Sequence, residues 1–484
     1  MTWVYALQRL LARGRPWYGL AALAACLAIG TVAGAAIAFL TPLYAVALAA
    51  AVAGGLLMLR SREFTLAVVI GIICLLPFAS VPLNVGFSPT FLNLALGVLL
   101  LVWAVRIATG RQEPWVASPV SPAVAIFMIL TFATFVAGLG HASLTPTSLR
   151  KFAEIPLGIA IFFAVLNNVR TRRSLEQVTL WLIAGGTAAA AIGIFLYVIP
   201  QPAAIRLLSA LGRLRYPTGP DVLRFIEDNP DLPMRAISTS VDPNVLGALL
   251  VLTMGLTAPH LAAPRPFIAR RWLALSMAIS GVCLFLTYSR GSMAGLVAGL
   301  ALLGLVGRYR RWLLIVIVVG ALLLLLPQAQ AYVAHFIEGV QGQDLATQMR
   351  FGEYKDALTL IQRYPWLGVG FVDTPDIDLY LGVSNLYLLI SEEMGVIGLA
   401  AFLLSAGTFF VTLLVAWQRQ RASGALAPWL LGPAVAILGG LVSGVFDHTL
   451  FSYSHALTLF WLIVGLGAAA AHLAAAPRPG EQPG

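Results

Sequence analysis

Arg290 is the residue whose position most strongly suggests chemistry. It lies in the sequence Thr-Tyr-Ser-Arg-Gly (residues 287–291), between two apolar runs that almost meet there. A guanidinium held toward the middle of a membrane costs roughly 2.5–3.5 kcal/mol, and less near an interface. An anionic ligand would offset this cost, because the planar guanidinium donates paired hydrogen bonds to phosphate and keeps its charge. The alternative is an arginine that extends into the outer lipid headgroups.

The segment around Arg350 predicts an amphipathic helix. Apolar residues recur at helical spacing over 345–361, with Tyr354 among them, and Pro365 ends the pattern. Such a helix could lie on the membrane surface with Arg350 and Lys355 toward headgroups or substrate. The alternative is a basic face that meets only solvent.

A later apolar run is also preceded by polar residues. Ser384, Asn385 and Tyr387 precede this run, and Glu393 is the last charged residue before it. Charged groups at the mouth of a span also serve as plain interfacial anchors. The catalytic candidates are therefore Arg290, Arg350, Ser384, Asn385 and Glu393.

Residues beside other apolar runs complete the set of candidates. Arg150 and Lys151 stand at the entrance of one run, and Arg235 precedes a polar segment that ends at Asp242. Asp242 alternatively caps a helix that starts near Pro243. For the two histidines that flank the last run, an interfacial or packing role is favoured over catalysis. The substrate-binding candidates are Arg150, Arg235, Asn244, Tyr354, Lys355, Tyr387, His448 and His455, and no metal site is expected.

The composition places the chain in a membrane. Of its 484 residues 60% are hydrophobic and 10% are charged, and the mean hydropathy is +0.89. A soluble domain has about 25% charged residues, so a cytosolic enzyme, a disordered chain and a nucleic-acid module are excluded. The three cysteines show no disulfide or zinc spacing. No Walker loop is present either, so any reaction must draw on a substrate that is already activated.

Charge-free runs predict an all-α polytopic membrane protein. With roughly 20 apolar residues per span, we count about 14 transmembrane helices, or about 12 if the short runs 43–59 and 154–168 do not cross. The first run is interpreted as a retained span, because it is longer than the apolar part of a secretory signal. The candidate spans are 17–40, 43–59, 64–80, 91–105, 121–139, 154–168, 177–199, 244–262, 272–288, 291–307, 312–327, 394–417, 426–446 and 452–473.

The basic residues predict which side of the membrane each loop faces. One side of the predicted topology holds 19 Lys and Arg residues against four acidic ones. Basic residues in short loops stay in the cytoplasm, so both termini are expected there. Two long segments, 200–243 and 328–393, then face outward. We expect one integral membrane domain over 1–484, with these two segments forming the face that carries the active site.

Several short segments between residues 235 and 400 follow one another in a characteristic order. They are Thr-Tyr-Ser-Arg-Gly (287–291), Arg350 with Tyr354 and Ala357, Pro-Trp-Leu-Gly-Val-Gly-Phe (365–371), Ser-Asn-Leu-Tyr-Leu (384–388) and Glu-Met-Gly-Val-Ile-Gly-Leu (393–399). In this order the chain resembles the O-antigen polymerase and ligase family of bacterial envelope enzymes.

The resemblance implies an outward-facing fold of the glycosyltransferase-C type in the bacterial inner membrane. Polymerases of this family move a growing glycan from undecaprenyl diphosphate onto the next lipid-linked repeat. Ligases move it onto the lipid A core, and some relatives transfer it to protein. Arg290 and Arg350 match arginines proposed to bind the diphosphate. The implied partners are an undecaprenyl-diphosphate-linked oligosaccharide, an acceptor glycolipid, membrane lipids and a chain-length regulator protein, with no nucleic acid, no cofactor and no need for ATP or metal.

Ser384 departs from the family pattern. Relatives commonly carry His at this position, and ligases are thought to use it to deprotonate the acceptor hydroxyl. A neutral serine hydroxyl is a poor general base. Either His448, His455 or Glu393 serves instead, or an oxocarbenium-like transition state needs little base. The departure favours a polymerase of O-antigen or exopolysaccharide repeats over a ligase.

Two other classes of function compete with this interpretation. A transporter or lipid flippase would suit the many spans, but the two halves of the chain show no convincing internal repeat. Two long segments on one face also fit one-sided chemistry better than alternating access. A scaffold for envelope assembly would leave Arg290 unexplained.

Overall fold

The computed structural model of the chain describes residues 52–81, 88–110, 114–141, 143–306, 345–371, 382–420 and 426–475, and positions 309, 310, 314, 318 and 424 singly. The chain divides into two compact units, Met1–Ser61 and Arg62–Gly484. In the first unit the described residues 52–60 are helical. The expected span 17–40 lies outside the described residues, as does most of the span 312–327.

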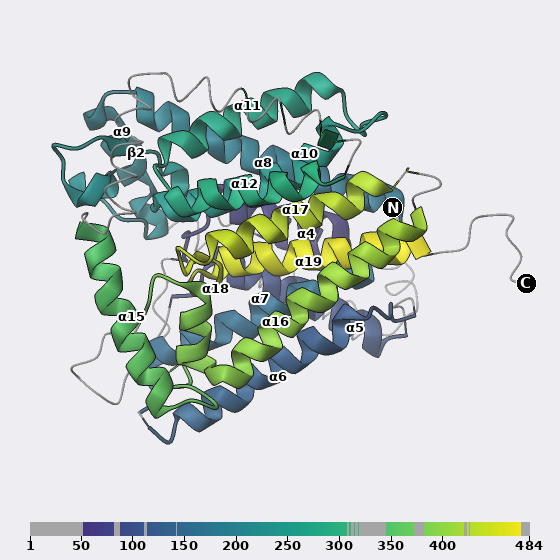
Figure 1. The fold of residues 1–484 in the computed structure, drawn as a ribbon, viewed down its shortest axis with the longest axis horizontal. Coiled ribbons are helices and arrows are strands. Elements are labelled where there is room, and N and C mark those ends of the chain that lie inside the picture. The colour runs from purple at the N-terminus through teal and green to yellow at the C-terminus, as the bar shows by residue number, and fades with distance from the viewer. Residues whose placement is uncertain are drawn as a thin grey trace, which may run out of the picture. The chain divides into compact units, whose positions relative to one another are not determined.

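Helices make up almost all of the second unit (Figure 1). Among the described residues α5, α6, α8, α10, α16 and α19 have the length and hydropathy to cross a membrane. The chain is therefore an all-α polytopic membrane protein, while the count of about 14 spans stays a prediction. The longer helices are α4 (Arg62–Leu75), α5 (Phe91–Ala108), α6 (Val120–Gly138), α7 (Pro146–Asn168), α8 (Arg172–Val198), α10 (Pro243–Leu261), α11 (Arg270–Leu286), α12 (Arg290–Gly304), α15 (Leu345–Arg363), α16 (Leu386–Gln420), α17 (Ala427–Ser443) and α19 (Ser454–Ala475).

Two helices begin earlier than the apolar runs predicted. Helix α7 begins at Pro146 rather than at 154, because Thr145 and Ser148 form a capping box ahead of its polar first turns. Helix α16 begins at Leu386 rather than at 394. Helix α10 begins where expected, since Asp242 Oδ1 accepts hydrogen bonds from the N–H groups of Asn244 and Val245. A charge-free run thus marks the apolar part of a helix and omits its polar entrance.

The segment 200–243 folds into short elements. It contains α9 (Gln201–Ala210), four 3-10 turns, and an antiparallel pair of short strands, β1 (Arg224–Phe225) and β2 (Met234–Arg235). Leu208, Val222 and Ile237 are buried against Leu196 of α8. This small apolar cluster holds the segment on the ends of the long helices.

Helices α12 and α17 meet through glycines. Gly291, Gly295 and Gly299 recur every four residues on one face of α12. A Cβ at Gly299 would lie 2.7 Å from the carbonyl oxygen of Val435, and one at Gly295 would overlap the carbonyl oxygen of Gly439. Small residues at this spacing let two helix backbones approach closely in a membrane. This glycine seam (Gly291, Gly295 and Gly299) fixes the height of Arg290 along α17.

Helix α16 breaks at Gly395 and changes direction there (Figure 1). Gly395 has φ 68° and ψ −177°, a conformation that favours glycine. The segment 365–371 enters this break: the N–H of Val369 bonds the carbonyl of Glu392 at 2.8 Å, and the N–H of Val396 bonds the carbonyl of Pro365 at 2.8 Å. The sequence segments 365–371 and 393–399 therefore form one structural unit.

Candidate functional site

The turn that carries Arg290 is held from the side by β2. Helix α11 ends at Leu286, whose carbonyl accepts the N–H of Ala236 at 2.8 Å. Arg235 Nε donates to the carbonyl of Thr287, also at 2.8 Å. Tyr288 takes a left-handed conformation with φ 53°, and α12 starts at the half-buried Arg290. Arg235, expected to bind substrate, thus positions the Arg290 turn.

The first turn of α12 has an open N-terminus. The hydroxyl of the N-cap residue Ser289 donates to Ser292 Oγ at 2.9 Å, and it makes no capping bond to the helix. The first N–H groups of a helix lack intrahelical partners, and the helix dipole is positive at this end. Arg290 therefore stands where backbone N–H groups and a guanidinium can bind the same anion.

Three segments far apart in the sequence converge on the turn between α17 and the short helix α18 (Thr449–Ser452), which we call the α17–α18 turn (residues 444–448). The backbone of Gly291 lies against Phe446, where a Cβ would come within 2.7 Å of the Phe446 Cβ. Asn385 Nδ2 donates to the carbonyl of Val445 at 2.8 Å. Asn244 Nδ2 donates to Asp447 Oδ2 at 2.9 Å. The turn therefore gathers the candidate residues of β2 and α10, of the Arg290 turn and of the Ser384 segment.

An asparagine links Arg235 to the carboxylate of Asp447 beside this turn. A terminal nitrogen of Arg235 donates to Asn244 Oδ1 at 2.8 Å, and Asn244 in turn bonds Asp447. Asp447 Oδ1 also accepts the N–H of Thr449 at 2.8 Å. Burial raises the pKa of Asp242, and the nearby Asp447 raises it further. Arg235, Asn244 and Asp447 thus form a hydrogen-bonded polar network. Asn244 is the residue that connects the other two.

Helix α15 joins the site through Glu353. Glu353 Oε2 accepts the N–H of Ser384 at 2.9 Å. Arg350 is half-buried and lies three residues earlier, so both side chains share one face of the helix. Tyr354 is also half-buried, whereas Lys355 is exposed. The helix predicted here is confirmed and ends at Arg363 before Pro365, while its amphipathic character and its place on the membrane surface stay predictions.

Glu393 is bound to α7. Lys151 Nζ lies 2.5 Å from Glu393 Oε1, and the Glu393 side chain is fully buried. The adjacent Glu392 accepts the N–H of Gly382 at 3.3 Å. Within the described part of the chain, Oε2 of Glu393 and Oε2 of Glu392 have no hydrogen-bond partner. Glu393 therefore forms a buried ion pair that ties α16 to α7.

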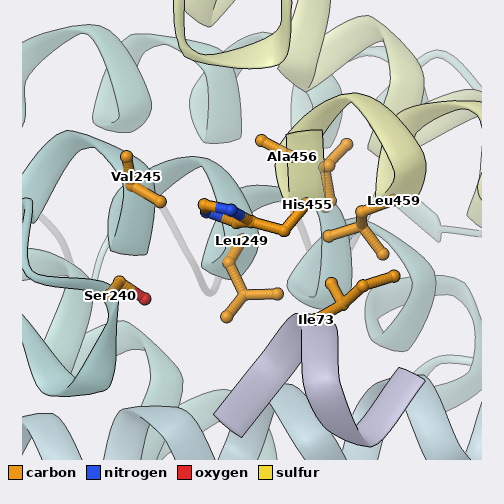
Figure 2. Close-up of a pocket in the computed structure, with 8 residues that line it drawn as sticks. Ile73, Ser240, Val245, Leu249, His455, Ala456 and Leu459 are labelled. Atoms are coloured by element: carbon orange, nitrogen blue, oxygen red, sulfur yellow. The ribbon is translucent and has the colours of Figure 1, made fainter. Parts of the chain in front are cut away.

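The two histidines have different surroundings. His448 is half-buried at the N-cap of α18 (Thr449–Ser452), and its Nδ1 lies 2.7 Å from Ser452 Oγ. His455 is buried beside a small apolar cavity, with its ring between Val245 and Leu249 of α10 and Ile73 of α4 (Figure 2). The ring of His455 also meets that of Phe78 edge-on at 4.9 Å. His455 packs, and His448 adjoins the α17–α18 turn.

Two further candidates have structural contacts. Asn385 Oδ1 accepts the N–H groups of Tyr387 and Leu388, which caps the start of α16. The Tyr387 hydroxyl donates to the carbonyl of Leu441 at 2.7 Å. Arg150 lies elsewhere, at a cavity whose lining contains neither Arg235, Arg290 nor Arg350.

Sequence reasoning missed Glu353 and Asp447. Asp447 had a visible signal, since it is a lone acidic residue at the end of an apolar run and directly precedes His448. Glu353 had none, because one acidic residue on a mixed helix face is ordinary. The Lys151–Glu393 pair joins residues 242 positions apart, and no local pattern indicates it.

Comparison with known proteins bears on this site. Residues 275–403 match the family model described as O-antigen ligase. The matched segment runs from α11 into α16 and contains all five catalytic candidates, Arg290, Arg350, Ser384, Asn385 and Glu393. No curated protein matches the chain. The resemblance to the O-antigen polymerase and ligase family is thus confirmed over residues 275–403.

Proposed function

We propose that the protein transfers a glycan from undecaprenyl diphosphate and polymerises lipid-linked repeat units. The observation that carries this proposal is the position of Arg290. Within the segment that matches the family, Arg290 begins α12 at an open helix N-terminus, and Arg235 holds its turn. A guanidinium at the N-terminus of a helix, where the helix dipole is positive, suits a diphosphate leaving group.

Arg290 and Arg350 stabilise the diphosphate as its bond to the sugar breaks. The acceptor hydroxyl attacks the anomeric carbon, the bond from this carbon to the diphosphate oxygen breaks, and the lipid diphosphate departs with the electron pair. Negative charge grows on the diphosphate during this step. Arg290 stabilises that charge, and Arg350, on the face of α15 that meets Ser384, approaches from the other side.

His448 is the best candidate for the general base. It lies within the α17–α18 turn, to which Asn385 and Asn244 are both bonded. When Nδ1 donates its proton to Ser452 Oγ, the lone pair of Nε2 is available to accept the acceptor proton. The other two candidates serve less well, because His455 is buried among Phe78, Val245 and Leu249 and Glu393 is paired with Lys151.

The topology completes the proposal. Both termini lie in the cytoplasm, and 200–243 and 328–393 face the periplasm, with the active site on this face and a fold of the glycosyltransferase-C type. The distribution of basic residues supports this orientation. The partners are the lipid-linked oligosaccharide, an acceptor glycolipid and, for control of chain length, a regulator protein.

The experiment that tests the proposal offers purified protein only lipid-linked repeats. We expect products lengthened by whole repeats. The second candidate is a ligase, which the description of the matching family favours. A product formed only when lipid A core is added would establish the ligase. Movement of lipid-linked glycan across vesicles without a new glycosidic bond would establish a transporter instead.

A further inference from the structure

A cavity of about 640 Å³ opens beside the first half of α7. Its wall is mainly apolar and includes Leu144, Leu149, Ala153 and Leu157, with Asn93 of α5 on the other side. Protein pockets for small molecules measure about 300–1,000 Å³. The cavity is therefore large enough for part of a lipid.

Helix α7 presents two different faces over these turns. Ser148, Phe152 and Ile155 are buried in the protein. Leu149 and Ala153 lie on the other face, exposed and lining the cavity. In a helix that enters the membrane, an apolar face left open in this way meets hydrocarbon rather than water. The occupant expected here is a hydrocarbon chain.

The cavity also has a polar end. Arg150 Nε lies 3.6 Å from Glu154 Oε1, which is too long for a good hydrogen bond. Asn93 Nδ2 donates to the same carboxylate oxygen at 3.1 Å. The terminal nitrogens of Arg150 make no hydrogen bond to any residue that the structure describes, and its side chain is 47% exposed. They can bind a phosphate in a bidentate way without breaking an existing hydrogen bond.

Asn93 offers a second polar contact. Its Oδ1 is buried and accepts no hydrogen bond from any residue that the structure describes. A buried acceptor without a partner is costly, and a ligand hydroxyl or amide would satisfy it. Sugar residues carry such donors. The polar end therefore suits a phosphate followed by a glycan.

We infer that this cavity binds the acceptor of the transfer, a glycan linked to polyprenyl diphosphate. The hydrocarbon lies against Leu149, Ala153 and Leu157, the diphosphate lies on Arg150, and the glycan extends past Asn93. The inference rests on the proposed function, in which two lipid diphosphates are bound at once. Two such anions repel each other, so they need separate cations, and the cavity lining does not include Arg290 or Arg350.

A chain of bonded groups leads from the cavity to the site. Lys151, next to Arg150, is paired with Glu393. The neighbouring Glu392 bonds the N–H of Gly382, two residues before Ser384. The cavity thus lies on the helix that is tied directly to the start of α16, which places an acceptor glycan toward the Ser384 segment.

The first test is photolabelling of the full chain in lipid nanodiscs with a benzophenone-bearing polyprenyl diphosphate. We expect labelled peptides within 144–157. Ala153→Trp and Leu149→Trp fill the cavity and should lower labelling about tenfold, the loss expected when roughly 1.4 kcal/mol of binding is removed. Leu101→Trp, at an exposed position of α5 outside the cavity lining, is the matched control and should label normally.

Two outcomes of the labelling experiment would overturn the inference. One is labelling that Ala153→Trp leaves unchanged. The other is competition by dioleoyl phosphatidylglycerol as effective as that by undecaprenyl diphosphate, which would make the cavity a site for ordinary bilayer lipid. Both outcomes can be read without any transfer activity.

The second test separates acceptor from donor. The donor is a lipid-linked repeat whose attacking hydroxyl is blocked, so that it cannot act as acceptor. Arg150→Ala should raise the KM for the acceptor about tenfold, through the loss of charge-assisted hydrogen bonds, with kcat and the donor KM nearly unchanged. An equal rise in the donor KM would assign the cavity to the donor. If the wild type transfers nothing while specific labelling persists, the proposed function fails and a lipid site without an acceptor role remains.

Discussion

The Lys151–Glu393 pair allows a quantitative test of how α7 and α16 are held together. Lys151→Ala would leave the carboxylate of Glu393 fully buried without its counter-ion. Breaking a buried ion pair by removing one partner costs about 3–5 kcal/mol. The Lys151 side chain is 43% exposed, so solvent screens part of the interaction. We therefore expect a loss of about 2–3 kcal/mol for Lys151→Ala, at or below the lower end of that range.

The second single change, Glu393→Gln, removes the charge of the glutamate and keeps that of Lys151. Glu393→Gln keeps the shape of the side chain and leaves only a half-exposed lysine without its partner. It should cost about 1 kcal/mol, because Lys151 can turn to water. In the double variant Lys151→Ala with Glu393→Gln neither charge of the pair remains. It should be at least about 1 kcal/mol more stable than Lys151→Ala alone.

Unfolding in mixed micelles with increasing dodecyl sulfate would measure these differences. The 11 tryptophans provide the fluorescence signal. Arg172→Ala breaks an exposed i,i+4 pair with Glu176 and is the matched control, with an expected change of at most about 0.5 kcal/mol. Strict additivity of the two single changes would refute the reasoning. So would a Lys151→Ala variant as stable as the wild type.

Three further predictions concern the site and its orientation. Arg290→Lys keeps the charge but loses the planar fork, so we expect a folded protein with about a hundredfold lower transfer activity; full activity would place the diphosphate elsewhere. Ser384→Ala should keep most activity, because the structure uses the backbone N–H of Ser384, whereas His448→Ala should lose it about a hundredfold; the reverse ranking would make the serine hydroxyl the active group. An impermeant reagent on intact cells should label a cysteine at Ala203 and not one at Thr171, and the opposite pattern would reverse the topology.

Much of the fold follows from hydropathy. Apolar runs of the right length predicted helices such as α5 and α10, whose observed starts lie close to the expected ones. The polar entrances of α7 and α16 were missed, because a search for charge-free runs stops where Arg150, Lys151 or Glu393 begins. Capping residues extend a helix through such charges, and hydropathy does not register them.

The site was predictable in its parts and less so in its connections. The turn at 287–291, the segment at 384–388 and the amphipathic helix over 345–361 were each visible in the sequence. That the first two meet at the α17–α18 turn depends on glycine contacts and on the side chain of Asn385, which are tertiary features. The hydrogen bond from Arg235 to the carbonyl of Thr287 is a tertiary feature too, and no local sequence pattern indicates it.

The glycine seam has a consequence for how the protein can vary. Helix α12 meets the backbone of α17 at Gly295 and Gly299, so its axial position depends on the absence of side chains at these two residues. A shift to the next register would move Arg290 by four residues, or about 6 Å along the axis, which is more than a diphosphate contact tolerates. The opposite face of α12 carries no such constraint, and Val297 is 66% exposed there. Exchange of one apolar residue for another on that exposed face, to match a thinner or thicker bilayer, should therefore leave Arg290 in place.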